Sequence, residues 1–103
     1  MHATIRRYES VDQTREIELT KKVNESLMPR LSELPGFSGY YLIDAKDGVM
    51  TSINLFDTSE HADASNRVSA DWIREEKLET VLPHAPELTL GEVVAFKNNG
   101  VRV

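Results

Sequence analysis

Residues 35–56 contain two runs rich in apolar, β-branched and aromatic side chains, bounded by turn residues, and this pattern predicts two β-strands joined by a tight turn. Pro35-Gly36 precedes the first strand, on which Phe37 is expected to share a face with Tyr41. Asp47-Gly48 separates the two apolar runs, and glycine supplies the positive φ that a hairpin turn needs. The rest of the chain is expected to place one strand and one helix on each side of this hairpin.

Apolar residues recur every three to four positions in two other regions, which predicts two helices. The first covers residues 11–34 and is expected to be capped by Asp12 and to kink or break at Pro29, which removes one intrahelical hydrogen bond. The second begins at Asp57, which has the spacing of a capping box with Glu60, and ends near residue 76. Its inner face is expected to carry Ala62, Ser65, Asn66, Ser69, Trp72 and Ile73.

Residues 2–9 and 88–96 are expected to form the first and last strands, with a bulge at Gly91. The two faces of the first strand are Ala3, Ile5 and Arg7 on one side and His2, Thr4, Arg6 and Tyr8 on the other. Only the first of these faces begins apolar, so we expect the second to meet water or a polar interface. Residues 98–103 are expected to form a tail or a short extra strand.

The element order strand, helix, strand, strand, helix, strand predicts an α+β fold over residues 1–97. This is the ferredoxin-like βαββαβ arrangement, in which a four-stranded antiparallel sheet carries both helices on one face. In a sheet with one face in water, apolar and polar residues alternate regularly along each strand, but neither hairpin strand has a wholly polar face. Too little chain remains to cover the second face, so we predict a homodimer.

Composition narrows the classes of function. A chain of 103 residues that is 40% hydrophobic fits one domain with one modest core. The net charge of −5 argues against a nucleic-acid partner, and no apolar run approaches the roughly 18 residues of a membrane span. The chain has no cysteine, which excludes disulfides and thiolate metal sites and fits a cytoplasmic location. The first ten residues contain no apolar segment typical of a signal peptide.

A resemblance to a known superfamily rests on the run LPGFSGYYLIDAKDGVMTSINLFDTSEHADASNRVSADWIRE. The run resembles small dimeric α+β-barrel proteins, the superfamily that includes the antibiotic biosynthesis monooxygenases, and within it a bacterial subgroup without established activity. The resemblance covers about residues 2–97. It implies two sheets packed face to face in a homodimer, no cofactor, and a small hydrophobic or aromatic ligand. It implies either a cofactor-free monooxygenase-like enzyme or a non-catalytic ligand-binding or dimerisation module.

The quinol-oxidising members of this superfamily use an Asn, a Trp, a Tyr and an Arg around the substrate. The resemblance therefore implies catalytic roles for Asn66, Trp72 and Tyr41, and substrate-binding roles for Arg6 and Tyr40. The predicted helix and strand faces add Ser69 and Asn54 as candidate substrate-binding residues. The spacing from Asn66 to Trp72 differs from the pattern expected for those members. Tyr40 and Tyr41 alternate across a strand, as do Arg6 and Arg7, so only one residue of each pair can point into a cavity.

Each candidate also has a structural interpretation. The small polar residues Ser65, Asn66 and Ser69 either line a pocket or allow close helix approach, with hydroxyls bonded back to the helix. Trp72 is either core or pocket wall. An inward arginine either holds an anionic substrate or pairs with a carboxylate.

Two types of chemistry are not expected. The three histidines His2, His61 and His84 lack the spacing of metal ligands, so no metal site is predicted. The haem-degrading members use an Asn on the first strand, where this chain offers Thr4 and no Asn, so haem degradation is not predicted.

Overall fold

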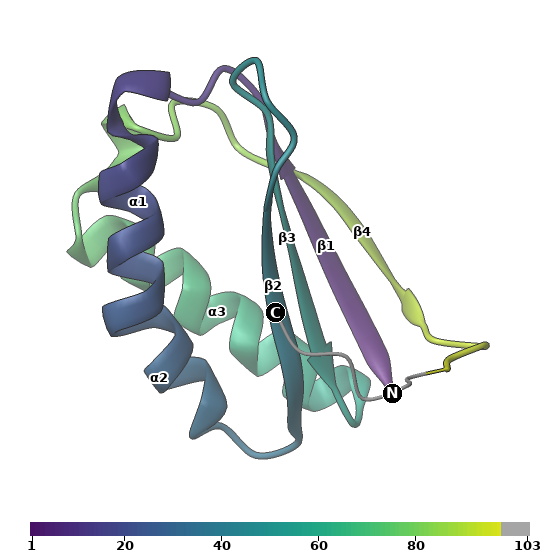
Figure 1. The fold of residues 1–103 in the computed structure, drawn as a ribbon. Coiled ribbons are helices and arrows are strands. Elements are labelled where there is room, and N and C mark those ends of the chain that lie inside the picture. Colours follow the sequence, from purple (N-terminus) through teal and green to yellow (C-terminus); the bar gives the residue numbers. More distant parts are fainter. Residues whose placement is uncertain (98–103) are drawn as a thin grey trace.

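A computed structural model describes residues 1–97, which form a four-stranded sheet with all the helices on one face (Figure 1). The main elements are β1 (His2–Tyr8), α1 (Glu16–Lys22), α2 (Met28–Ser32), β2 (Phe37–Asp44), β3 (Met50–Phe56), α3 (Ser59–Glu75) and β4 (Glu87–Glu92). The strand order is β2-β3-β1-β4, and every neighbouring pair is antiparallel. The predicted ferredoxin-like topology is confirmed. The expectation for residues 98–103 lies outside the described residues.

The predicted hairpin is formed by β2 and β3. Lys46, Asp47 and Gly48 all have positive φ, between 55° and 78°, and the Ala45 amide donates to the Val49 carbonyl at 3.0 Å. Glycine and aspartate tolerate this left-handed backbone, which explains why the turn falls at Asp47-Gly48.

The alternation predicted for the start of β2 is wrong by one residue. A register irregularity between Phe37 and Gly39 places Phe37 opposite Phe56, so the two rings lie on the same, helix-covered face. Their centroids are 5.7 Å apart in an edge-to-face arrangement. A bulge adds one residue to a strand, so the residues before the bulge point to the opposite face from the one that strict alternation predicts. A sequence pattern with a period of two therefore cannot predict it.

The first helical segment is continuous but changes geometry before Pro29. Asp12 caps its 3₁₀ start, as predicted, because its carboxylate accepts from the Thr14 amide at 3.0 Å. The turn Val23–Leu27 is π-helical, and the Met28 amide donates to the carbonyl of Val23, five residues back. The expected kink or break at Pro29 therefore takes the form of a π turn that ends just before the proline.

Helix α3 begins one residue later than the capping-box spacing predicted. The cap is Thr58, whose hydroxyl accepts from the His61 amide at 3.2 Å. Asp57 is held outside the helix because its amide donates to the Gly36 carbonyl at 2.9 Å. Its carboxylate accepts from Nδ1 of His61 at 2.6 Å.

The polar face of β1 is buried, which contradicts the expectation that it meets water. Thr4, Arg6 and Tyr8 are at most 8% exposed and lie beneath the helices. Their neighbours are also polar, since Ser52 and Asn54 of β3 lie opposite Arg6 and Thr4. The polar side chains of β1 thus face other polar groups within the interior.

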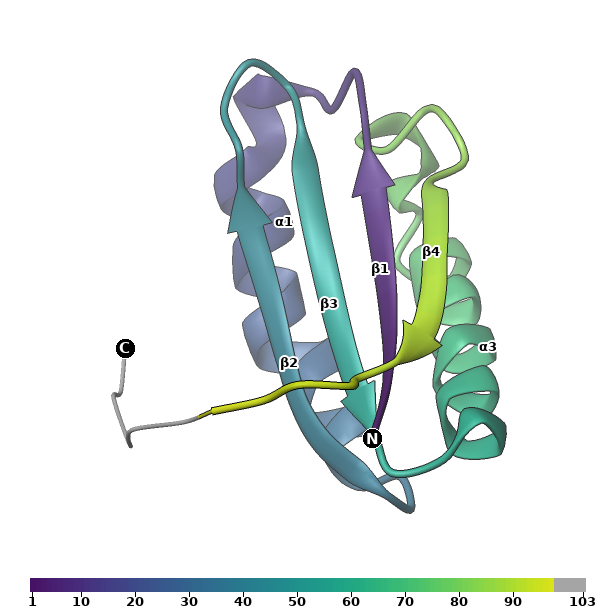
Figure 2. The same cartoon turned by 90° about the vertical axis from the view of Figure 1, so that its right-hand side faces the viewer.

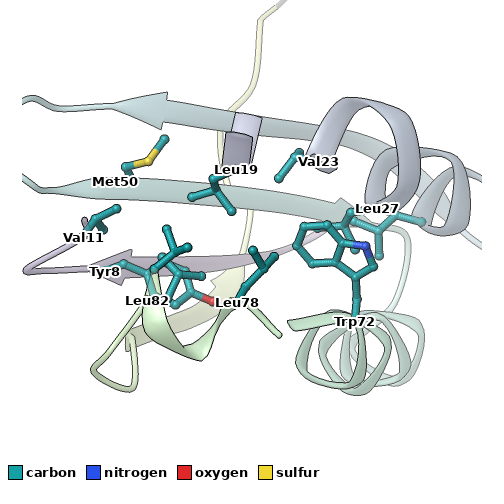
Figure 3. Packing of buried hydrophobic residues seen from close by; sticks show 11 residues of the cluster. Tyr8, Val11, Leu19, Val23, Leu27, Met50, Trp72, Leu78 and Leu82 are labelled. Atoms are coloured by element: carbon teal, nitrogen blue, oxygen red, sulfur yellow. The ribbon is translucent and has the colours of Figure 1, made fainter. Parts of the chain in front are cut away.

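The apolar core fills the rest of the space between sheet and helices. Leu27 of the first helical segment lies beside the ring of Trp72 from α3, and Tyr8 lies near Leu82 (Figure 3). The buried apolar cluster consists of Tyr8, Val11, Leu19, Val23, Leu27, Leu31, Met50, Trp72, Leu78, Val81 and Leu82. This cluster fixes the position of α3 over the centre of the sheet.

Strand β4 ends at Glu92 rather than at residue 96, and Gly91 pairs regularly with Ala3 without a bulge. The physical reason lies in β1, which begins at His2 opposite Glu92 and so offers no partner strand beyond that point. Residues 93–97 leave the sheet edge and extend away from the sheet, on the side of its uncovered face (Figures 1 and 2).

The uncovered face of the sheet is largely apolar. Tyr41 and Ile43 are 54% and 44% exposed on it, and Ile5 lies opposite Ile53 at its centre. Within residues 1–97, the helices are all too short or too polar to cross a bilayer.

Candidate functional site

A cavity of about 30 Å³ lies between the sheet and the helices. Its walls are mainly apolar and include Leu19, Val23, Leu27, Leu42, Met50, Trp72, Ile73 and Leu82. The polar side chains that reach it are Arg6, Tyr8, Tyr40, Ser52 and Ser69. A few placed polar groups among apolar walls are typical of small-molecule sites.

Arg6 is the cation of this cavity. Its side chain comes from the middle of β1, where the alternation of the strand directs it beneath the helices, and the residue is only 7% exposed. Its Nη2 donates to Oδ1 of Asn66 on α3 at 2.7 Å. Within residues 1–97 it forms no ion pair with an acidic side chain. Burial lowers the pKa of Arg6, but a guanidinium starts so high that it stays charged at neutral pH.

Two tyrosines lie near this cation with their hydroxyl groups protonated. Burial raises the pKa of Tyr40 to about 12, and it also raises the pKa of Tyr8, while the nearby charge of Arg6 opposes both shifts. A protonated phenol donates a hydrogen bond and cannot serve as a base at neutral pH. The cavity therefore offers hydrogen-bond donors and a positive charge.

Trp72 forms one wall of the cavity. The residue is 1% exposed, and its indole Nε1 donates to Oγ of Ser26 at 3.0 Å. Because the indole N–H already has this acceptor, Trp72 contributes a ring surface to the cavity. Trp72 is therefore both a core residue and part of the cavity wall.

The small polar residues of α3 were expected either to line a pocket or to bond back to their own helix, and the structure shows both roles. Ser65 donates back to the carbonyl of Ala62 at 2.7 Å, which is the structural role. Ser69 lines the cavity, and its buried hydroxyl has no hydrogen-bond partner within residues 1–97. Asn66 does not line the cavity itself, but its amide oxygen holds Arg6.

Asn54 lies beside the cavity, not in its wall. It is fully buried opposite Thr4 on β1, and within the described residues its amide atoms and the Thr4 hydroxyl have no hydrogen-bond partner. An unpartnered buried amide is costly, by roughly 1–3 kcal/mol for each group. The substrate-binding role of Asn54 stays a prediction.

The structure does not bring Tyr41 together with the other candidates. Tyr41 is on the uncovered face of the sheet, whereas Tyr40 points beneath the helices and lines the cavity. Arg6 is likewise the inward member of its pair, and Arg7 is exposed. Alternation along a strand separates the members of each pair.

Sequence reasoning missed three residues of this region. Tyr8 lies two positions after Arg6 on the same strand face, and Ser52 lies opposite Arg6 on β3, so strand periodicity together with the register would have identified both. Ser26, the acceptor for Trp72, lies in the π turn, which the sequence did not predict.

No candidate metal site is present among residues 1–97, since they contain no group of three or more histidine, aspartate or glutamate side chains placed to hold an ion. The expectation of a cofactor-free protein stays a prediction.

Solved structures match the chain over nearly its whole length, although no family model and no curated protein does. A protein of unknown function from Nitrosomonas europaea has a TM-score of 0.75 at 17% identity, with 97% of this chain and 95% of that one covered. A monooxygenase from Streptomyces coelicolor, in complex with the ligand nanaomycin D, has a TM-score of 0.72 at 12% identity, with 96% and 92% covered.

A heme-degrader from Mycobacterium tuberculosis, with two hemes bound in its active site, is also similar. Its TM-score is 0.64 at 19% identity, with 95% of this chain and 100% of that one covered. At such identities a structural likeness establishes the fold and leaves the function to the site. The chain has the fold of the antibiotic biosynthesis monooxygenase-like proteins, as the sequence resemblance implied.

Proposed function

We propose that this chain, which shares the fold of the antibiotic biosynthesis monooxygenase-like proteins, is a homodimer that binds a small hydrophobic or aromatic molecule between its sheet and helices. The observation that supports this most strongly is the interior cavity, with apolar walls around the buried side chain of Arg6. A pocket of this kind is the usual site of ligand binding in a small domain. A cytoplasmic location and the absence of a nucleic-acid partner remain predictions from composition.

The uncovered sheet face supports the homodimer. A contiguous exposed apolar surface is typical of an interface, and a second copy of the same sheet matches this face in size and polarity. Residues 93–97 extend on the same side of the sheet and carry the exposed side chains of Val94 and Phe96, which increases the apolar area available to a partner.

The enzymatic form of the proposal is cofactor-independent oxygenation of an electron-rich phenol. The substrate supplies the electrons: a reactive ring CH₂ becomes a carbonyl, one atom of O₂ enters the product and the other leaves as water. The phenol of Tyr40 would donate to the substrate oxygen, Asn66 would hold Arg6 in position through its amide oxygen, and Trp72 would orient the ring. The substrate would enter as its phenolate, with its proton already lost to solvent, and Arg6 would pair with that negative charge.

The second candidate is a non-catalytic ligand-binding protein. Within the described residues no Asp, Glu or His side chain lines the cavity, so it contains no ordinary base. The volume of about 30 Å³ is well below the roughly 150 Å³ of an engineered cavity that takes up benzene, so both candidates require the cavity to open before an aromatic ring can enter. Ligand binding without oxygen consumption would favour this candidate.

Replacing Asn66 with alanine separates the two candidates. If the chain is an oxygenase, this change removes the hydrogen bond that holds the guanidinium of Arg6 in the cavity, and oxygen uptake with a panel of quinols should fall about tenfold to a hundredfold. An oxygen electrode measures the rate. The matched control is Arg67→Ala, which truncates the exposed neighbour of Asn66 on α3 and should leave the rate unchanged. No uptake by the wild-type protein, or equal rates for Asn66→Ala and wild type, would rule out the enzymatic form.

A further inference from the structure

The buried guanidinium of Arg6 forms no ion pair with an acidic side chain of residues 1–97. All 17 acidic residues lie within residues 1–97, and none of them forms an ion pair with it. Arg7, its neighbour on the opposite face, does pair with Glu9. In a chain with a net charge of −5, an inward arginine that lacks a carboxylate is a distinctive feature of the cavity.

A buried charge is costly unless another charge or several hydrogen bonds compensate it. Arg6 has one hydrogen bond, from Nη2 to Asn66, whereas a guanidinium carries five N–H donors. The remaining donors suit an oxygen anion, because the planar fork of arginine matches a carboxylate and also pairs with a phenolate.

We propose that the natural ligand of the cavity is a small aromatic monoanion whose charged oxygen pairs with Arg6. This inference rests on the small-molecule role proposed above and adds the charge of the ligand. Ser69 supports it, because its buried hydroxyl lines the same cavity without a partner in residues 1–97 and can donate to the same oxygen. The ring of the ligand then lies against Trp72 and Leu27, which face one another (Figure 3).

The first helical segment must move outward to admit a ring. It supplies Leu19, Val23 and Leu27 to the cavity wall, and two of these residues lie in the π turn. A π turn replaces part of the regular α-helical hydrogen bonding and is frequent at functional sites. Outward movement at this turn enlarges the cavity while the sheet and α3, which hold Arg6 and Asn66, stay in place.

Isothermal titration calorimetry with two matched probe pairs tests the charge of the ligand. Benzoate and benzamide have nearly the same shape and differ in charge, and 4-nitrophenolate and 4-nitroaniline form the second pair at mildly alkaline pH. We expect at least one anion to bind about tenfold or more tightly than its neutral counterpart, which is the effect of a hydrogen bond to a charged group. The pair that shows the preference distinguishes a carboxylate from a phenolate.

Arg6→Gln should lower the affinity for the preferred anion about tenfold and leave the neutral probe unchanged, because glutamine keeps a donor for Asn66 without the charge. Arg7→Gln is the matched control, one residue away on the opposite face, and should bind as wild type does. Equal affinities for the anion and the neutral probe in the wild-type protein would overturn the inference and leave the proposed function intact. If neither charge type binds, the inference and the small-molecule role fail together.

Discussion

Replacing Trp72 with alanine should lower the free energy of unfolding by about 3–5 kcal/mol, the usual cost of deleting a buried tryptophan side chain. Trp72 is 1% exposed, is part of the apolar core, and donates to Ser26 at 3.0 Å. The change removes the hydrogen bond of Trp72 to Ser26 and its packing against Leu27, and it enlarges the cavity beside them. Thermal unfolding followed by circular dichroism, at one fixed protein concentration, should show a midpoint lower by about 4–8 °C for each kcal/mol.

The control for this experiment is Ile17→Ala. Ile17 is 88% exposed on α1, so its truncation should change stability by no more than about 0.5 kcal/mol. If Trp72→Ala were as stable as Ile17→Ala, the packing described for the helix layer would be wrong.

A lysine at position 53 should abolish the homodimer. Ile53 lies at the centre of the uncovered sheet face, opposite Ile5 on β1 and Tyr41 on β2. A charge at the middle of an apolar interface loses its water on association and has no partner there, so the penalty is several kcal/mol and the affinity falls by orders of magnitude. Light scattering coupled to size exclusion, at micromolar protein, should give twice the chain mass for the wild-type protein and the monomer mass for Ile53→Lys.

Ile17→Lys makes the same substitution on an exposed helix position and should keep the dimer mass. A monomeric wild-type protein, or a dimeric Ile53→Lys variant, would contradict the proposal that a second copy covers this sheet face.

Local patterns predicted the larger part of the fold. The hairpin followed from Asp47-Gly48 between two apolar runs, and the inner face of α3 followed from a helical period that includes Ser65, Ser69 and Trp72. These features depend on residues close together in the sequence. The order of the strands and helices along the chain then predicted the ferredoxin-like topology.

The errors have a common physical origin in contacts between distant segments. Asp57 fits a cap by spacing, but its amide is bonded to Gly36, so Thr58 takes that role. Strand β4 looks longer in the sequence than it is because β1 provides partners only as far as His2. The polar face of β1 was expected to meet water or a polar interface because the helices that cover it lie elsewhere in the chain.

The candidate site was predicted in part. A single period placed Asn66, Ser69 and Trp72 on one helix face, and the structure brings that face to the cavity or to Arg6. The choice between Arg6 and Arg7, or between Tyr40 and Tyr41, could not be made, because each strand is mixed in polarity on both faces. In the structure, Arg6 and Tyr40 are the members of the two pairs that lie beneath the helices and line the cavity.

The most direct test of the small-molecule cavity uses the one tryptophan of the chain, whose indole N–H gives a single, isolated resonance in a ¹⁵N-correlated spectrum. Titration with benzoate or hydroquinone should shift the Trp72 indole signal saturably, together with the methyl groups of Leu27 and Leu42 in the same cavity wall. The methyl groups of the exposed Ile17 should not move. Saturable shifts confined to the uncovered sheet face, or none at Trp72 up to the solubility limit of both probes, would contradict the account.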